Sequence, residues 1–387
     1  MDYLVPGVYR QAVVRTAPAR LPTGVPGFVG CAGSPPDPLA PAQALTPVAT
    51  PVALQRKEDF ARAFRPVEGS FLADAVAGFF DNGGERCYVV RTDADPAGDP
   101  ARVVAGLVQA LAALGPLADL DLVAVPDAMA LDAAQDSALV QCEVLRHCAS
   151  HGNRFAILDA RREATPEAVE EQRDALAEGA AEPVNGALYY PWVAQPGPAR
   201  RMVPPSGHVA GIYARTDAKA GVFKAPANEE LLGIADIEWP LDADAQARLN
   251  PGGVNCLRPL PGRGIRVWGA RTLSRQDEWR YVNVRRLFLT VHRWIDLHLA
   301  WASFEPNDAR LWNRIRRELE AYLSQLWRAG AFAGETPGEA FFVRCDAETN
   351  PPESRELGRV VSEIGLAPAA PAEFIVVRIT QQATAAA

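Results

Sequence analysis

The sequence predicts an α/β fold for the middle of the chain and an α+β fold for its C-terminal part. The middle alternates helical patterns with short, almost wholly apolar runs, which is typical of a parallel sheet covered by helices on both faces. The C-terminal part has two long helical patterns followed by β-type runs. Proline is frequent near the N-terminus, so extended segments are expected there rather than a packed core.

Residues 1–30 are predicted to form an N-terminal arm together with a strand of the C-terminal core domain. Valine and tyrosine favour β structure in this segment, but its four prolines exclude a helix and exclude a central strand across the whole length. Residues 31–51 follow as a linker rich in proline and alanine.

Residues 52–250 are assigned to the α/β middle domain. In SFLADAVAGFFDNGGERCYVVRT, apolar residues recur at helical spacing, Asn82-Gly83-Gly84 ends the helix, and a β-type run follows. Later helical patterns are followed by runs of the same kind. The strands predicted in this way are 87–90, 122–125, 155–158 and 186–193.

The segment 206–263 is rich in glycine and proline, and it is predicted to be loop-rich chain with short strands that packs where two domains meet. Residues 251–371 are assigned to the C-terminal domain, with long helices over about 282–301 and 308–329. Residues 372–387 are assigned to a C-terminal arm.

The second of these helices has a strongly specified start. Pro306 restricts Glu305 to extended backbone, and Asn307 or Asp308 can accept hydrogen bonds from the first free N–H groups of the helix. An apolar stripe then faces a side rich in arginine and glutamate, and Gly330 is the expected stop. Such a cap contributes about 0.5–2 kcal/mol, whereas burying the stripe contributes on the order of ten, so packing decides the helix.

Composition excludes several classes of protein. The formal net charge of −8 argues against nucleic-acid binding, which depends on neutralising phosphates. No stretch approaches the roughly 18 apolar residues of a membrane-spanning helix, and the N-terminus has no secretory signal pattern, so folding in the cytoplasm is expected. The six cysteines form no CxxC pair and are predicted to be buried, reduced thiols. We expect neither a metal nor a cofactor.

Catalytic motifs are weak. No phosphate-binding GxxxxGK[ST] loop is present. Asp159, His208 and Ser274 follow the Asp, His, Ser order of subtilisin-type hydrolases, but Ser274 lacks the glycine turn of that family. Ser206 stands only two residues from His208 and would be a poor partner for it. A working triad is therefore not expected, and a subtilisin-like hydrolase is the least favoured function.

The block RYVNVRRLFLTVHRWIDLHLAWASFEPNDARLWNRIRRELEAYLSQLWRAGAFAGETPGEAFFVRCD resembles the C-terminal domain of contractile tail sheath proteins of phages and bacterial contractile injection systems. VPGVYRQ is similar to the family's N-terminal arm, and FLADAVAGFFDNGGERCYVVR to its first helix and strand. PPSGHVAGIYARTDAKAGVFKAPAN and GRGIRVWGARTLS resemble its mid-chain signature. The blocks span nearly the whole chain in the family's order, but the chain is short for the family, which suggests few or no inserted outer domains.

The resemblance implies a middle domain that is subtilisin-like in fold and not catalytic, so the protein is not expected to be an enzyme. It implies a structural sheath subunit that polymerises as stacked, hexameric rings around an inner tube and contracts to drive the tube through a target envelope. The implied partners are further copies of the chain, the inner tube protein, and baseplate and terminator or cap proteins, with no nucleic acid and no membrane insertion. Assembly is expected in the bacterial cytoplasm, into a phage tail or an injection particle that can be released from the cell.

One structural alternative is a non-contractile, ring-forming tail terminator or baseplate protein of the same fold. In either case the resemblance implies that the arms are lent to neighbouring subunits. Terminal β segments are exposed edges in a monomer, and pairing with another chain covers them; docking on the same subunit is the alternative. The arm residues predicted to make these contacts are Tyr3, Val5, Val8, Tyr9, Phe374, Val376, Val377 and Ile379.

Arginines cluster on the two long C-terminal helices, although the chain as a whole is acidic. They are candidates to face an acidic tube surface, and the competing interpretation is an ordinary solvated helix face. The candidates are Arg285, Arg286, Arg293, Arg314, Arg316 and Arg317.

Overall fold

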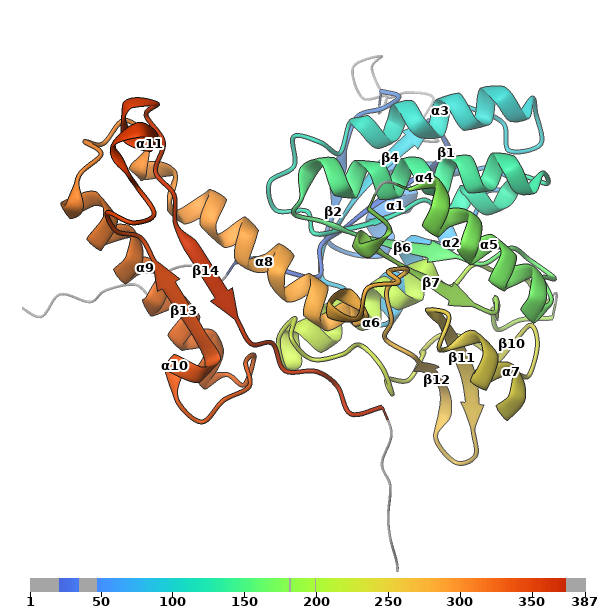
Figure 1. Ribbon diagram of the computed structural model, residues 1–387. Helices are drawn as coiled ribbons and strands as arrows, with labels where there is room; N and C mark the ends of the chain where they lie inside the picture. The colour runs from blue at the N-terminus through green and yellow to red at the C-terminus, as the bar shows by residue number, and fades with distance from the viewer. Residues whose placement is uncertain (1–20, 35–46, 181, 199, 374–387) are drawn as a thin grey trace, which may run out of the picture.

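The computed structural model describes residues 21–34, 47–180, 182–198 and 200–373 (Figure 1). In this part of the chain a nine-stranded sheet forms the centre of a large body, and a smaller lobe stands beside it. We use "body" for the described residues 21–281 and "lobe" for residues 309–366. The sheet order is β12-β11-β7-β6-β5-β1-β4-β2, with β3 paired to β1, and the architecture is mixed α/β as expected.

The centre of the sheet is β1 (Pro26–Gly33), which runs parallel to β5 (Leu122–Ala124) on one side and to β4 (Cys87–Thr92) on the other. This corrects the expectation that residues up to 30 belong to an arm and residues from 31 to a linker. Pro26 is tolerated because it is the first residue of the strand. Gly30 lets the strand pass close to its neighbours, since a Cβ there would lie 2.7 Å from Asp127 Oδ2.

The other strands of the sheet extend it in both directions. β6 and β7 follow β5 in parallel, as their apolar runs predicted, and β11 continues this parallel set. β12 and β2 close the two ends as antiparallel strands. The bounds are β2 (Val52–Leu54), β3 (Arg65–Pro66), β6 (Phe155–Asp159), β7 (Gly186–Tyr190), β11 (Val254–Leu260) and β12 (Gly264–Trp268).

Helices cover both faces of the sheet and enclose two apolar cores, one on each side (Figure 1). The amphipathic helices lie where the 3.6-residue pattern placed them. They are α1 (Glu58–Ala63), α2 (Leu72–Asp81), α3 (Pro100–Ala112), α4 (Ala134–His151) and α5 (Pro166–Gly179). A small second sheet in the order β10-β8-β9 consists of Asp236–Ile237, Val193–Ala194 and Met202–Val203.

The prediction that the segment 206–263 is loop-rich is wrong in its first part, because α6 (Ser206–Lys219) is a fourteen-residue helix packed on α2. A Cβ on Gly207 would lie 2.2 Å from the Ala75 carbonyl oxygen, so the two helices touch backbone to backbone. A helix buried on nearly every side has no polar face, and its sequence therefore lacks the amphipathic period that reveals surface helices. The shorter α7 (Ala243–Leu249) lies in the same segment.

The lobe follows α8 (Val282–His298), which extends from the body toward it (Figure 1). It contains α9 (Ala309–Arg328), α10 (Pro337–Ala340), α11 (Pro352–Glu356) and an antiparallel pair formed by β13 (Phe341–Arg344) and β14 (Glu363–Leu366). The predicted cap of α9 is confirmed, since Asp308 Oδ1 accepts hydrogen bonds from the N–H groups of Arg310 (2.8 Å) and Leu311 (3.1 Å).

All six cysteines lie within the described residues and are unpaired, and five of them are buried, with Cys142 partly exposed. Among the described helices, none combines the length and the apolar character needed to cross a bilayer.

Candidate functional site

The N-terminal end of the described chain is fastened to the body at a buried cluster of four charged side chains, which we call the charge node: Asp121, Asp217, Arg286 and Arg293. Asp121 accepts hydrogen bonds from the N–H groups of Gly24 (3.0 Å) and Val25 (2.7 Å), just before β1 begins. Its Oδ2 also accepts one from Arg286 of α8 at 3.1 Å. The node thus joins the entry to β1, the sheet and α8.

Arg286 is the centre of the charge node. Its guanidinium makes two hydrogen bonds to the Asp217 carboxylate, at 2.8 and 2.5 Å, and the side chains are 2% and 1% exposed. Burial alone would lower the pKa of Arg286, but Asp217 and Asp121 raise it above its usual value. Burial also raises the pKa of Asp217, and the Arg286 cation opposes that shift. Buried charges of this kind persist only when they are paired.

Arg293, about two helical turns after Arg286 on α8, completes the node. Its Nη2 donates to the carbonyl oxygens of Pro22 (2.7 Å) and Asp119 (3.1 Å), and its Nη1 lies 3.8 Å from Asp121 Oδ2. Arg293 therefore holds Pro22 directly, and Arg286 acts through Asp121, which holds Gly24 and Val25. Both arginines fasten the chain close to the start of its described part.

This placement changes the interpretation of the six arginines that were candidates to face a tube. Arg286 and Arg293 are buried in the node, so in this conformation they are not surface groups. Arg285 lies with its guanidinium carbon 4.8 Å from the centre of the Trp279 ring, and its Nε donates to Asn185 Oδ1 at 2.7 Å. The structure does not bring the six residues together.

The other three candidates lie on α9 in the lobe. Arg314 covers the ring of Trp301 at 3.5 Å and lies 3.3 Å from Glu318. Arg316 lies 3.9 Å from Glu320, and Arg317 Nε donates to the Asn313 carbonyl oxygen at 3.3 Å. These side chains are partly or fully exposed, and their tube-facing role stays a prediction.

The C-terminal end of the described chain is fastened by a different contact. After β14 the chain returns to the body, where the Ala369 carbonyl oxygen accepts a hydrogen bond from Asn283 Nδ2 of α8 at 3.3 Å. Glu373 then forms a two-point ion pair with Arg271, with Nε–Oε1 at 3.0 Å and Nη2–Oε2 at 2.5 Å. Both predicted arms therefore begin next to anchored residues of the body.

The predicted arm residues themselves, Tyr3, Val5, Val8, Tyr9, Phe374, Val376, Val377 and Ile379, lie outside the described residues, and their role stays a prediction. The lobe presents the complementary feature. β13 and β14 form a two-stranded sheet, and within the described chain neither strand pairs with a third. Phe342 of β13 is 56% exposed. Open strand edges beside an exposed aromatic side chain can accept a strand from another segment.

The residues of the rejected catalytic triad have structural roles. Asp159 Oδ1 accepts the N–H of Ser206 at 2.7 Å in the first turn of α6, and burial raises the pKa of Asp159 to about 7. His208 packs its ring against Gly78 of α2, and burial lowers its pKa to about 4. Ser274 Oγ accepts the N–H of Gln276. These contacts do not form a Ser–His–Asp relay.

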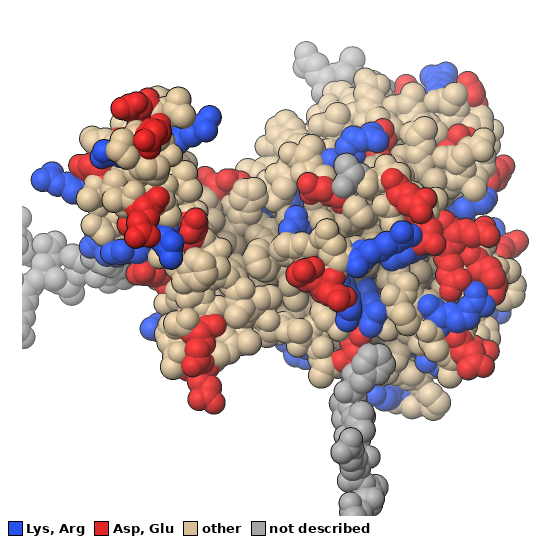
Figure 2. Space-filling view, viewed as in Figure 1, with Lys and Arg blue, Asp and Glu red and all other residues tan. Residues whose placement is uncertain are grey.

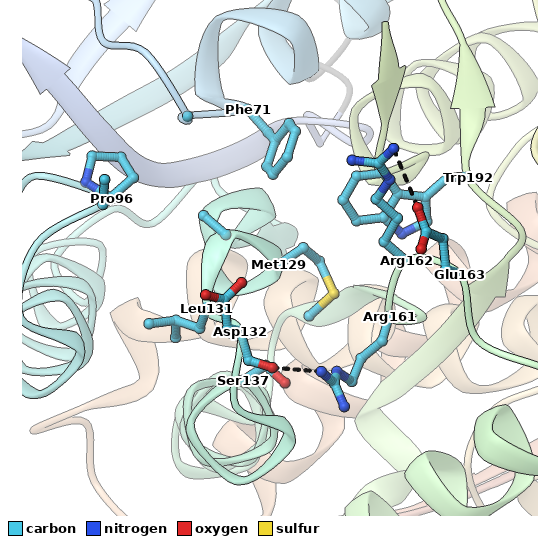
Figure 3. A pocket seen from close by; sticks show the side chains of 13 residues that line it. Phe71, Pro96, Met129, Leu131, Asp132, Ser137, Arg161, Arg162, Glu163 and Trp192 are labelled. Atoms are coloured by element: carbon cyan, nitrogen blue, oxygen red, sulfur yellow. Dashed lines mark hydrogen bonds and ion pairs between the residues drawn. The ribbon is translucent and has the colours of Figure 1, made fainter.

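A hollow of about 490 Å³ lies at the carboxyl ends of the parallel strands, where α/β enzymes bind ligands (Figure 3). Figure 3 shows Phe71 and Trp192 on one side of it, and their rings meet edge to face at 5.1 Å. Its arginines are already engaged: Arg161 donates to the Asp132 carbonyl oxygen at 2.6 Å, and Arg162 lies 3.4 Å from Glu163. The described residues contain no group of three or more His, Cys, Asp or Glu placed to hold a metal ion.

Charges on the face of the molecule shown in Figure 2 are mixed rather than gathered by sign. Lysine and arginine alternate with aspartate and glutamate over the body, and much of the lobe surface in this view is uncharged. A mixed face of this kind offers no extended basic surface for nucleic acid.

Two family models match the chain. The phage tail sheath protein central domain matches residues 102–273, and the phage tail sheath C-terminal domain matches residues 274–382. A putative prophage major tail sheath protein of Pseudomonas aeruginosa (strain UCBPP-PA14) is 30% identical over 180 residues, which are 45% of each chain. The tail sheath protein of Salmonella phage ViI is 27% identical over 43% of this chain and 26% of its own length. The chain therefore matches less than half the length of these two relatives.

Several solved structures match over nearly their full length. The helical sheath of the anti-feeding prophage in its contracted state is 30% identical, covers 98% of this chain and 99% of its own, and has a TM-score of 0.76. The sheath complex of an extracellular contractile injection system, PVC, in its contracted state is 29% identical over 99% of both chains, with a TM-score of 0.74. A chain in the structure of the anti-feeding prophage baseplate is 31% identical over 98% of this chain and 99% of its own, with a TM-score of 0.74.

Proposed function

Because the chain belongs to the phage tail sheath family, we propose that it polymerises around an inner tube as the sheath subunit of a contractile tail or injection machine. The observation that carries this proposal is the match to a contracted helical sheath over 98% of the chain, at 30% identity and a TM-score of 0.76. The match extends over both the body and the lobe, so the similarity is to the complete sheath subunit of that structure rather than to one shared domain.

We further propose that the subunits form stacked hexameric rings joined by exchanged strands. The lobe supports this, since the β13–β14 pair has open edges in the described chain and an extended segment could add to either edge. The 20 residues before Leu21 could span up to about 70 Å if extended, more than twice the roughly 30 Å length of a 20-residue helix such as α9. A head-to-tail contact that does not close on itself continues as a helix, as a sheath requires.

In this proposal the stroke is mechanical. The extended sheath is metastable, and a change in the packing between subunits shortens and widens it, which drives the tube through the target envelope. Catalysis is not required for this stroke. We propose that the middle domain is subtilisin-like in fold without being catalytic, and the structural contacts of Asp159, Ser206 and His208 support this. The fastened arm roots allow strand pairing to persist while each body rotates as a unit.

The proposed partners follow from this arrangement. They are other copies of the chain, an inner tube protein, a baseplate and a terminator or cap, with no nucleic acid, no membrane insertion and no cofactor. We propose Arg314, Arg316 and Arg317 of α9 as the group that faces the tube, because they are the exposed members of the arginine cluster. Assembly is proposed to occur in the bacterial cytoplasm, before the particle is completed as a phage tail or an injection system.

Electron microscopy of truncated chains tests the proposal. The full chain is expected to form long striated cylinders in negative stain, and chains lacking residues 1–12 or 372–387 are expected to stay folded without forming them. Circular dichroism checks the fold of each truncated chain. Long cylinders from both truncated chains would contradict strand exchange through the arms.

The similarity to a chain in a baseplate structure favours one second candidate, a sheath-like protein that forms a ring but no long polymer. The same images separate the two functions, because that protein would give isolated rings at every concentration of the full chain. A subtilisin-like hydrolase would instead have a serine that reacts with a fluorophosphonate probe, and we expect no labelling.

A further inference from the structure

The two arm roots are fastened to the body with unequal strength. The N-terminal root is held by the charge node, whose Arg286 and Asp217 side chains are 2% and 1% exposed, and it continues directly into the central strand β1. The C-terminal root is held near its end by the Arg271–Glu373 pair, whose side chains are 10% and 16% exposed. Water screens the second contact more strongly.

Arg271 is nevertheless a fixed point of the body. Its N–H donates to Asn255 Oδ1 and its carbonyl oxygen accepts from Asn255 Nδ2, both at 2.7 Å, and Asn255 lies on β11 inside the sheet. A β-bridge to Tyr281 fixes the same residue from the side of α8. The guanidinium is therefore presented at a defined place, whether or not Glu373 is bound.

Arg271 lies among other arginines, so its positive charge is stabilised by a neighbouring carboxylate. A hollow of about 380 Å³ beside it is lined by four arginines, Arg173, Arg271, Arg275 and Arg280. The other three have carboxylates from the body: Asp174 contacts Arg173 and Arg275, and Asp277 contacts Arg280. For Arg271, the carboxylate that contacts it within the described chain comes from the tail.

We propose that the Arg271–Glu373 pair is a clasp that sets where the C-terminal arm leaves the body, and that it is the anchor that opens first when neighbouring subunits rearrange. Arg271 is then a positioning residue for strand exchange. Two-point contact with a carboxylate fixes direction as well as distance, so the closed clasp points the residues after Glu373 along one path. Few contacts must break to release residues 369–373: the two ion-pair bonds, the Asn283–Ala369 hydrogen bond, and the hydrogen bond from the Ala369 N–H to the Ala331 carbonyl oxygen at 3.1 Å.

The opening of the clasp can be measured on the isolated chain without any assembly. Within residues 369–373 of the described chain, the hydrogen-bonded amide is that of Ala369, which donates to the Ala331 carbonyl oxygen at 3.1 Å. Its hydrogen exchange is expected to speed up about tenfold in Glu373→Ala, which removes the carboxylate, and in Arg271→Lys, because lysine cannot make the two-point contact. Glu230→Ala is the matched control: Glu230 is an exposed glutamate of the body that lies 3.9 Å from Arg266, and its loss should leave the exchange of Ala369 unchanged. Residues 24–33 should exchange slowly in every variant, which also confirms that the body is folded.

The role of the clasp in assembly rests on the proposed sheath function and needs a second readout. Glu373→Ala is expected to give at least fivefold fewer or shorter cylinders than Glu230→Ala at the same protein concentration. If Ala369 exchanges no faster in Glu373→Ala, or if the cylinders of that variant match the control in number and length, the clasp is refuted. If the unaltered chain forms no cylinders at all, the proposed function fails, while the exchange result still decides whether the clasp exists.

Discussion

Replacing Arg286 by methionine is the most direct test of the charge node. The change removes the cation that lies 2.5 Å from Asp217 Oδ2 and 3.1 Å from Asp121 Oδ2, and it leaves two buried carboxylates without that partner. Removing one side of a buried pair costs about 3–5 kcal/mol, because the remaining charge stays desolvated. For 387 residues, with an unfolding entropy of about 2.1 cal/mol/K per residue, that loss corresponds to a fall in melting temperature of roughly 4–6 °C.

The assay is urea or thermal unfolding of the isolated chain at pH 7, followed by circular dichroism. Arg316→Met is the matched control, since Arg316 is a 40% exposed arginine that lies 3.9 Å from Glu320, and such surface pairs contribute about 0–1 kcal/mol. The double variant Asp217→Asn, Arg286→Met should recover part of the loss, because it also removes one unpaired carboxylate. A loss below about 1 kcal/mol for Arg286→Met alone would refute the idea that the node holds the N-terminal root in place.

Three further predictions concern the body and the lobe. Between pH 4 and 6.5, Asp159, whose pKa is about 7 when folded, makes stability fall as pH rises, whereas His208, at about 4, makes it rise. Relative to the unaltered chain, Asp159→Asn should therefore gain about 3 kcal/mol of stability as the pH rises over that range, and urea titrations in which the two chains change in parallel would contradict this assignment. Gly207→Val should destabilise the body by about 2 kcal/mol or more, because any Cβ meets the Ala75 carbonyl oxygen at 2.2 Å; unchanged unfolding would contradict the backbone contact of α6 with α2. Leu319→Ala, in the buried face of α9, should cost about 2–5 kcal/mol and increase amide exchange in the lobe first, and an effect confined to the body would contradict a separate lobe core.

Local chemistry allowed the amphipathic helices and the cap of α9 to be predicted from sequence. Asp308 caps the helix because its side chain reaches the N–H groups of Arg310 and Leu311, so the contact is fixed within four residues of chain. The parallel strands could also be predicted from the sequence, because burial on both faces makes them short apolar runs.

The features that sequence could not give depend on distant neighbours. β1 (Pro26–Gly33) is central because residues 87–92 and 122–124 pair with it, whereas the prolines of residues 1–30 suggested an arm. α6 lacks a polar face because α2 and the sheet bury it. Arg286 and Arg293 looked like surface arginines, and only the positions of Asp121 and Asp217, each more than 60 residues away, show why they are buried.

The charge node was therefore missed entirely, although one signal was available. Arg286 and Arg293 occupy the same helix as the apolar residues Leu287 and Val291, so a stripe predicted to be buried carried two cations. A cation inside an apolar stripe requires a buried carboxylate, and that requirement predicts a partner even where the sequence cannot say which one.

One helix connects all the parts that a sheath subunit must keep together. α8 holds the N-terminal root through Arg286 and Arg293 and touches the C-terminal root through Asn283. Its Leu287 and Val291 also belong to the apolar cluster that includes Leu323, Phe332 and Ala340 of the lobe region. A force applied to the lobe therefore reaches the body through a helix that is anchored in the sheet by buried ion pairs. If the stroke is a rigid-body movement, α8 keeps the body and the lobe together, and the weaker C-terminal clasp is the first of the two anchors to open.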